Sequence, residues 1–176
     1  MGSTISRTGL VGAIVAITMA GTALADPDPS AARTVQGTWY VQVTPRNCTT
    51  GEPVAPPIVS LVTFHKGGTL TEAPAALAFA PGQRTPGHGT WERKPGGTYE
   101  QRFAALIAFT TAPGPVFGLP PGPMGPGFEA GWQTVTQTVT LVDRDHLESE
   151  GTNAFYRTDG TLYRSGCSTA TGTRFE

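Results

Sequence analysis

The stretch "QGTWYVQVTPRNC", residues 36–48, decides the fold of this chain. Apolar and polar side chains alternate from Gly37 onward, and Trp, Tyr and Val are residue types that favour extended backbone. Period-two alternation places every second side chain on one face of a strand. The stretch therefore predicts a strand that begins at Gly37 and points Trp39 and Val41 toward the same side.

The same signals recur along the rest of the chain. Alternating runs rich in Thr, Val, Tyr and Trp are separated by Gly-based turns, and no segment sustains a helical period beyond one or two turns at 74–80. The alternation predicts eight strands, at residues 37–44, 58–65, 68–73, 87–93, 98–110, 131–142, 146–156 and 161–169.

The connections between these strands indicate how the strands are arranged. Four connections are tight and rich in Gly or Asp, and three are long, at 45–57, 74–86 and 111–130. If each strand pairs with the next, all three long connections fall at one end and three of the four tight turns at the other. The expected fold is all-β, an eight-stranded antiparallel up-and-down barrel with a closed base and a mouth ringed by long loops. An open sandwich of two four-stranded sheets would fit the same alternation.

The longest connection, residues 111–130, has an unusual composition. Pro and Gly make up 11 of its 20 residues, yet it also carries apolar residues such as Phe117. Pro and Gly exclude a regular ladder or helix here. We expect either a flap over the mouth, with Phe117 against an apolar ligand or partner, or a variable insertion whose hydrophobic residues pack on the rim.

The N-terminal segment is expected to be a signal peptide over residues 1–25. One cation, Arg7, precedes an apolar run that ends in "ALA" at 23–25, which predicts cleavage before Asp26. A membrane anchor needs about 20 apolar residues, more than this run provides. Residues 26–35 then form a flexible leader and 36–176 the barrel domain of a secreted or periplasmic protein without a membrane anchor.

The net charge and the lack of known catalytic and metal-binding motifs in the sequence make several classes of function unexpected. Without residues 1–25 the chain has 11 cations and 13 anions, a net charge of about −2 with no basic stripe, so nucleic acid is not an expected partner. No phosphate loop, GxSxG or zinc-type His spacing occurs, and His146 and Glu148 lack a third metal ligand. We therefore predict no cofactor, metal or catalytic residue, and whether the protein is an enzyme stays open.

Five further titratable residues have simpler expected roles. Glu72, Glu92 and Glu100 are expected to be surface carboxylates. His65 and His88 are acid or base candidates only if the barrel is an enzyme.

Two cysteines, Cys48 and Cys167, remain after the expected cleavage site. An even count in an exported chain favours a disulfide. Two buried free thiols or a redox pair are the alternatives.

Gly37-x-Trp39 at the head of the first strand, an eight-stranded meander and an export signal resemble the lipocalin and wider calycin group. The resemblance implies that Trp39 packs inward at the closed base, with a late Arg, here Arg174, across its ring. A cation over an indole contributes about 0.5–2 kcal/mol. A register with Cys48 opposite Cys167 would place Arg174 opposite Val41.

The inward faces of the predicted strands are mostly apolar, with a few amides. Burial then supplies affinity for a small apolar molecule and the amides orient it. Alternatively, the amides face solvent or pair with one another in a filled core. The candidate ligand-binding residues are Trp39, Tyr99, Gln101, Phe103, Phe117, Gln133, Gln137 and Asn153.

Three functions are consistent with these patterns. The first is an exported lipocalin-like barrel that binds a small apolar ligand, and it requires an unfilled interior. The second is a barrel cyclase or isomerase that acts on a flexible small molecule, and it requires an inward acid or base beside the amides. The third is an inhibitor or adhesion module that acts through its mouth loops, and it requires a filled core.

Overall fold

A computed structural model of the protein describes residues 2, 34–75, 78–111 and 127–175. The expected signal peptide (1–25), most of the leader, and Phe117 lie outside the described residues.

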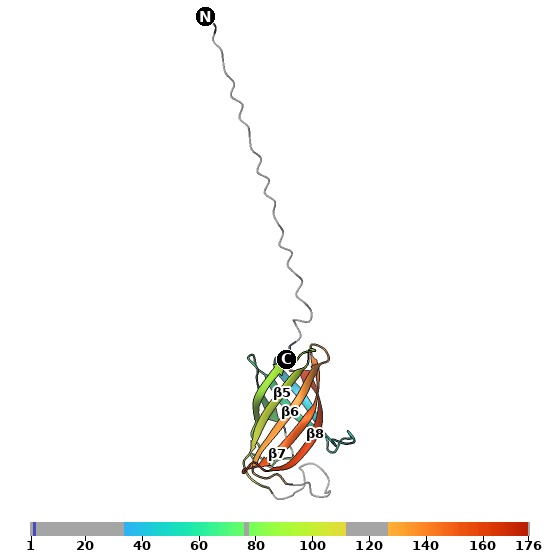
Figure 1. The fold of residues 1–176 in the computed structure, drawn as a ribbon, viewed down its shortest axis with the longest axis vertical. Helices are drawn as coiled ribbons and strands as arrows, with labels where there is room; N and C mark the ends of the chain where they lie inside the picture. Colours follow the sequence, from blue (N-terminus) through green and yellow to red (C-terminus); the bar gives the residue numbers. More distant parts are fainter. Residues whose placement is uncertain (1, 3–33, 76–77, 112–126, 176) are drawn as a thin grey trace.

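The chain forms one closed antiparallel barrel whose strand order follows the sequence (Figure 1). The strands are β1 (Gly37–Arg46), β2 (Ile58–Phe64), β3 (Thr69–Pro74), β4 (Gly87–Arg93), β5 (Tyr99–Ile107), β6 (Gly131–Leu141), β7 (His146–Arg157) and β8 (Leu162–Arg174). Because β8 pairs with β1, the sheet has no free edge, and the open sandwich is excluded. The expected all-β barrel is confirmed.

The greatest difference from the expected boundaries is at the end of the chain. Strand β8 continues to Arg174, five residues beyond the predicted end at residue 169. Its second half, "STATGT" (168–173), offers only small side chains and so carries little hydrophobic signal. The small size is useful in the barrel, since a Cβ at Gly172 would come within 2.9 Å of Leu147.

The two ends of the barrel differ as the connection lengths predict. The long connections β1–β2, β3–β4 and β5–β6 leave the mouth, and the tight turns β2–β3, β4–β5 and β6–β7 close the base. The tight β7–β8 turn is also at the mouth. The C-terminus lies at the base, which is the upper end in Figure 1.

The base is plugged by Trp39 and Arg174. Trp39 is fully buried, and its indole Nε1 donates to the Val35 carbonyl at 2.7 Å. The Arg174 guanidinium lies 4.2 Å from the Trp39 ring and donates to the carbonyls of Gln36 (2.7 Å), Thr34 (3.0 Å) and Arg144 (2.9 Å). The Arg174 cation lies over the Trp39 ring and is surrounded by three carbonyls, so it joins the segment before β1 and the end of β8 to the β6–β7 turn.

The seam between β1 and β8 differs in register from the expectation. Trp39 pairs directly with Arg174, Val41 pairs with Gly172, and Arg46 pairs with Cys167. The prediction that Arg174 lies opposite Val41 is therefore wrong by two residues. The reason is that Cys48 lies beyond the end of β1, in the turn at 47–51, and reaches Cys167 from there rather than as a ladder partner.

The disulfide itself is present, between Cys48 and Cys167, with Cα atoms 5.1 Å apart. It joins the β1–β2 loop to β8 across the seam. A structural disulfide indicates an oxidising, extracytoplasmic compartment.

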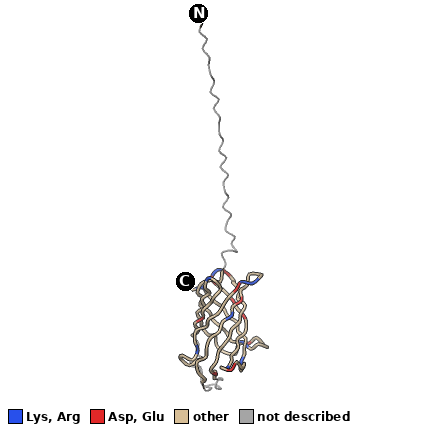
Figure 2. Tube along the Cα trace, turned by 60° about the vertical axis from the view of Figure 1, so that its left-hand side comes forward, with Lys and Arg blue, Asp and Glu red and all other residues tan. Residues whose placement is uncertain are grey.

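Charged side chains of both signs are scattered over the barrel and gather at its turns and ends, leaving much of the wall uncharged (Figure 2). Along β6 the outward positions are Thr134, Thr136, Thr138 and Thr140. In the part of the chain described here, no helix has the length and apolar character needed to cross a membrane.

Replacing Arg174 tests the base plug. We expect Arg174→Ala to lower the free energy of unfolding by about 2–4 kcal/mol, because the cation–π contact and three hydrogen bonds are lost together. Urea denaturation measures the change. Arg144→Ala, a control whose side chain is 85 % exposed, is expected to change stability by less than about 0.5 kcal/mol. Equal effects of the two variants would contradict the plug.

Removing the disulfide tests the seam. The bridge closes a loop of 119 residues, so the double variant Cys48→Ser/Cys167→Ser is expected to lose on the order of 2–5 kcal/mol. The comparison is thermal or urea unfolding of the oxidised protein and the variant. An unchanged midpoint would mean that the bridge contributes nothing to barrel closure.

Candidate functional site

A cavity of about 590 Å³ occupies the barrel between the base plug and the mouth. Its volume is in the range of pockets that hold small organic molecules. Most of its wall is aliphatic or aromatic. The main apolar contributors are Val41, Val62, Phe64, Phe103, Val135 and Phe155.

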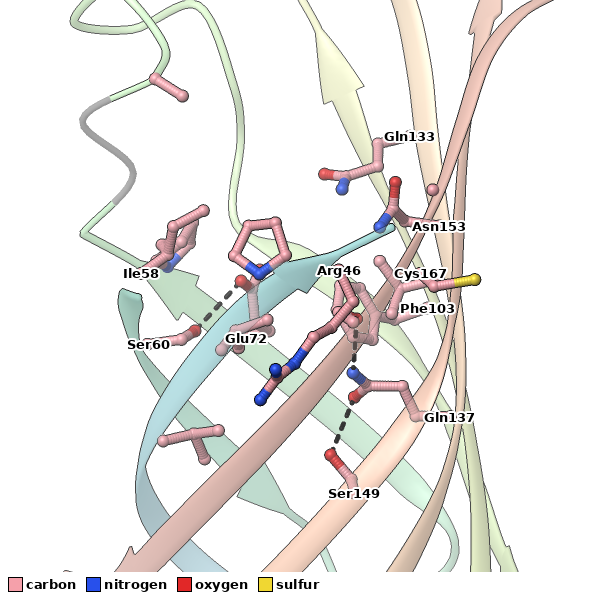
Figure 3. Close-up of a pocket in the computed structure, with 18 of the residues that line it drawn as sticks. Arg46, Ile58, Ser60, Glu72, Phe103, Gln133, Gln137, Ser149, Asn153 and Cys167 are labelled. Atoms are coloured by element: carbon pink, nitrogen blue, oxygen red, sulfur yellow. Dashed lines mark hydrogen bonds between the residues drawn. The ribbon is translucent and has the colours of Figure 1, made fainter. Parts of the chain in front are cut away.

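A polar group lies deep in this apolar wall (Figure 3). Gln101 on β5 donates through Nε2 to Oε1 of Gln137 on β6, which also accepts from Ser149 Oγ at 3.4 Å. Gln137 Nε2 in turn donates to Ser168 Oγ at 3.2 Å. Oε1 of Gln101 is buried and has no hydrogen-bond partner among the described residues. These amides hold one another and stiffen the β5–β6–β7–β8 wall.

A second polar group, nearer the mouth, contains a buried ion pair. Arg84 Nη1 is 3.0 Å from Glu72 Oε2, with 5 % and 8 % of the two side chains exposed. Ser60 Oγ donates to Glu72 Oε1 at 3.0 Å, and Arg84 Nε donates to Gln133 Oε1 at 2.7 Å. The expectation that Glu72 is a surface carboxylate is wrong, because it lies inside the barrel and lines the cavity.

The local sequence explains how the Glu72 side chain is accommodated inside the barrel. It follows Leu70 by two residues on β3, and Leu70 is buried in the core, so the alternation directs both inward. A Cβ at Gly87, on the next strand, would come within 2.6 Å of the Phe103 ring and 2.9 Å of Glu72 Oε2. Glycine at this position leaves the space that Phe103 and the carboxylate occupy.

Aromatic side chains gather where the cavity meets the mouth. Phe79 of the β3–β4 loop stacks on Phe128 at 4.2 Å between ring centroids, and Phe128 lies 5.1 Å from Phe155 of β7. The Arg164 guanidinium lies 4.6 Å from the Phe128 ring centroid. Phe79, Phe128 and Arg164 all line the cavity, so they form part of its upper wall.

Gln83 holds these mouth loops together. Its side chain is fully buried, and Nε2 donates to Phe109 O (2.9 Å), Thr111 Oγ1 (3.1 Å) and Phe128 O (3.4 Å). Its Oε1 accepts from the Ala80 amide at 3.0 Å. One amide thus joins the β3–β4 loop to both ends of the β5–β6 connection and fixes the segment that carries Phe128.

The residues predicted to bind ligand fall into three groups. Trp39 and Tyr99 lie in the core at the base, outside the cavity lining. Phe117 lies outside the described residues. Five residues line the cavity, namely Gln101, Phe103, Gln133, Gln137 and Asn153.

Sequence reasoning missed Glu72 and Arg84 of the upper wall and Gln83 beside it. Phe128 is one of the apolar residues of the connection 111–130, which the sequence predicts to lie over the mouth or to pack on the rim. The alternation on β3 could have indicated that Glu72 points into the barrel, because Glu72 shares a face with the buried Leu70. Gln83 and Arg84 lie inside the long connection 74–86, which carries no periodicity, so nothing in the pattern marked them.

The other titratable candidates lie outside the cavity. His65 and His88 are exposed on the outer side, and Glu92 pairs across the β4–β5 hairpin with Glu100. Lys94 donates to Glu92 and holds the pKa of that carboxyl below its ordinary value. The described residues contain no group of three or more His, Cys, Asp or Glu side chains arranged to hold a metal ion.

The sequence matches no protein-family model, and a search of curated proteins finds no match to it. The closed antiparallel barrel is consistent with a lipocalin-like or calycin-like architecture, and the fold alone carries that likeness.

Replacing Gln83 tests the organisation of the mouth. We expect Gln83→Ala to raise amide hydrogen exchange about tenfold or more at Ala108 and Thr111, because two carbonyls and one hydroxyl at the mouth lose their donor. Exchange along β1 should stay the same. Gln42→Ala, an exposed glutamine on the outer wall, is the matched control. Equal exchange at the mouth in both variants would show that Gln83 holds nothing in place.

Proposed function

We propose that the protein is an exported, lipocalin-like barrel that binds a small, largely apolar molecule in its central cavity. The observation that carries the proposal is the 590 Å³ space above the Trp39–Arg174 plug. Its apolar wall supplies affinity by burial, and its lining includes residues of the long connections at the mouth, such as Val54, Phe79 and Phe128. The disulfide and the signal-like residues 1–25 support export.

A probe that reports on apolar cavities tests this function. N-phenyl-1-naphthylamine, a neutral fluorophore, is expected to bind the purified protein with a blue-shifted, enhanced emission. Val135→Trp places a large ring in the cavity from β6 and is expected to weaken binding about tenfold or more, a loss of about 1.4 kcal/mol.

The matched control is Thr136→Trp, because Thr136 is the next residue of β6 and points to the outer face. It is expected to bind the probe like the wild type. No probe binding by the wild type, or equal binding by the wild type and Val135→Trp, would contradict a ligand in the barrel.

A second candidate function is favoured by one observation. The cyclase or isomerase hypothesis requires an inward acid or base beside amides, and Glu72 is inside the cavity with Gln133 bound to its partner Arg84. The Glu72 carboxylate is held in place by Arg84 and by the Ser60 hydroxyl, so it is positioned at the cavity wall where a substrate would contact it.

Mass spectrometry of the molecule extracted from the purified protein separates the two functions. A binding protein yields the same molecule from the wild type and from Glu72→Gln. An enzyme yields product from the wild type and unconverted substrate from Glu72→Gln. The inhibitor or adhesion function is not proposed, because it needs a filled core.

A further inference from the structure

Three side chains of the upper cavity wall, Arg84, Gln133 and Asn153, have polar atoms without a hydrogen-bond partner among the described residues. Arg84 donates through Nε to Gln133 and through Nη1 to Glu72 and to the Thr85 carbonyl at 3.1 Å. Among the described residues, its Nη2 has no hydrogen-bond partner. The Arg84 side chain is 5 % exposed, and its two Nη2 N–H groups are available to a ligand in the cavity.

The side-chain amides of Gln133 and Asn153 also have atoms without a hydrogen-bond partner among the described residues. Gln133 uses Oε1 to accept from Arg84, so its Nε2 is directed away from that bond, and Nε2 has no partner within the described part of the chain. Asn153, across the β6–β7 ladder next to Val135, makes no side-chain hydrogen bond to any described residue. Figure 3 shows the Gln133 and Asn153 amides extending into the same part of the cavity.

These unused groups are mostly donors. Arg84 Nη2, Gln133 Nε2 and Asn153 Nδ2 are N–H groups, and one unused acceptor, Asn153 Oδ1, stands beside them. These N–H groups are accessible from the cavity, so a ligand that displaces water from it is favoured if it brings oxygen acceptors to this place. A guanidinium with two N–H groups free is suited to a carboxylate.

The charge of the wall agrees with an anionic group. Among the described residues, the cavity lining contains one carboxylate, Glu72, and three guanidinium groups, Arg46, Arg84 and Arg164. Arg46 is engaged with Thr169 and the Gly51 carbonyl. Hydrogen bonds to a hydroxyl and a carbonyl leave the guanidinium charge in place, so cationic side chains outnumber the carboxylate in this lining, which favours an anionic head group.

We propose that Arg84, Gln133 and Asn153 form a carboxylate-binding subsite, so that the ligand is an apolar monocarboxylate with its head near the mouth and its apolar body toward the base. The proposal rests on the proposed function, because it places a head group in the same cavity. Glu72 then acts as the positioning residue, since it fixes Arg84 Nη1 and leaves Nη2 for the ligand.

Three ten-carbon chains that differ only in the head group test the subsite. Isothermal titration calorimetry with decanoate, 1-decanol and decylammonium at neutral pH compares an anion, a neutral alcohol and a cation. We expect decanoate to bind the wild type at least tenfold more tightly than 1-decanol, a difference of 1.4 kcal/mol or more, and decylammonium to bind most weakly.

Two variants identify the atoms responsible. Asn153→Leu keeps a similar volume and removes no hydrogen bond within the described protein. Glu72→Gln/Arg84→Met removes both charges of the ion pair together, so that no lone buried charge remains. Each is expected to abolish most of the preference for decanoate while 1-decanol still binds.

The outcomes separate this inference from the proposed function. Equal binding of all three chains by the wild type, or an unchanged decanoate preference in both variants, overturns the carboxylate subsite and leaves cavity binding standing. No binding of any chain, together with no N-phenyl-1-naphthylamine binding, overturns both.

Discussion

The pairing of β1 with β8 is the interaction on which the rest of the structure depends. This seam removes the last free edge of the sheet and brings the two ends of the described chain side by side, with Trp39 directly opposite Arg174. Their contact at 4.2 Å then fills the base, and the disulfide fastens the other end of the seam near the mouth. An interior that is closed below and enclosed all round can keep a cavity, because its walls are held by hydrogen bonds and not by a filled core.

The cavity wall divides into a lower part, whose amides bind one another and leave only the buried Gln101 Oε1 without a partner among the described residues, and an upper part that keeps donors facing the cavity. In the lower part, Gln101 and Gln137 bind each other, and Gln137 also binds two serines. These hydrogen bonds link the walls of β5, β6, β7 and β8. Above, Arg84 is anchored by Glu72 and Gln133 but retains unused donors. Burying an ion pair in an apolar wall costs desolvation energy, so it is a poor device for stability alone. The proposed role of Arg84 in binding the ligand head group would account for a buried ion pair at this place.

Much of the architecture could be predicted from the sequence, because period-two alternation and linker length are local signals with a direct geometric meaning. They located all eight strands, the mouth, and the inward glutamines. They did not give the seam register, since Cys48 bonds from a turn and the small residues of β8 carry no hydrophobic signal. They also missed Glu72 and Arg84 in the upper wall. Glu72 was assigned to the surface for its charge although it shares the face of Leu70, and Arg84 lies in a connection without periodicity.

The most direct test of the account is the seam itself, observed in solution by nuclear Overhauser effects between α-protons of β1 and β8. The account predicts cross-strand contacts between Val41 and Gly172 and between Trp39 and Arg174, because these residues face each other across the ladder. If those contacts are absent while the β1–β2 and β7–β8 contacts are present, the sheet is open. The enclosed cavity, the plug and the ligand site would then all be contradicted.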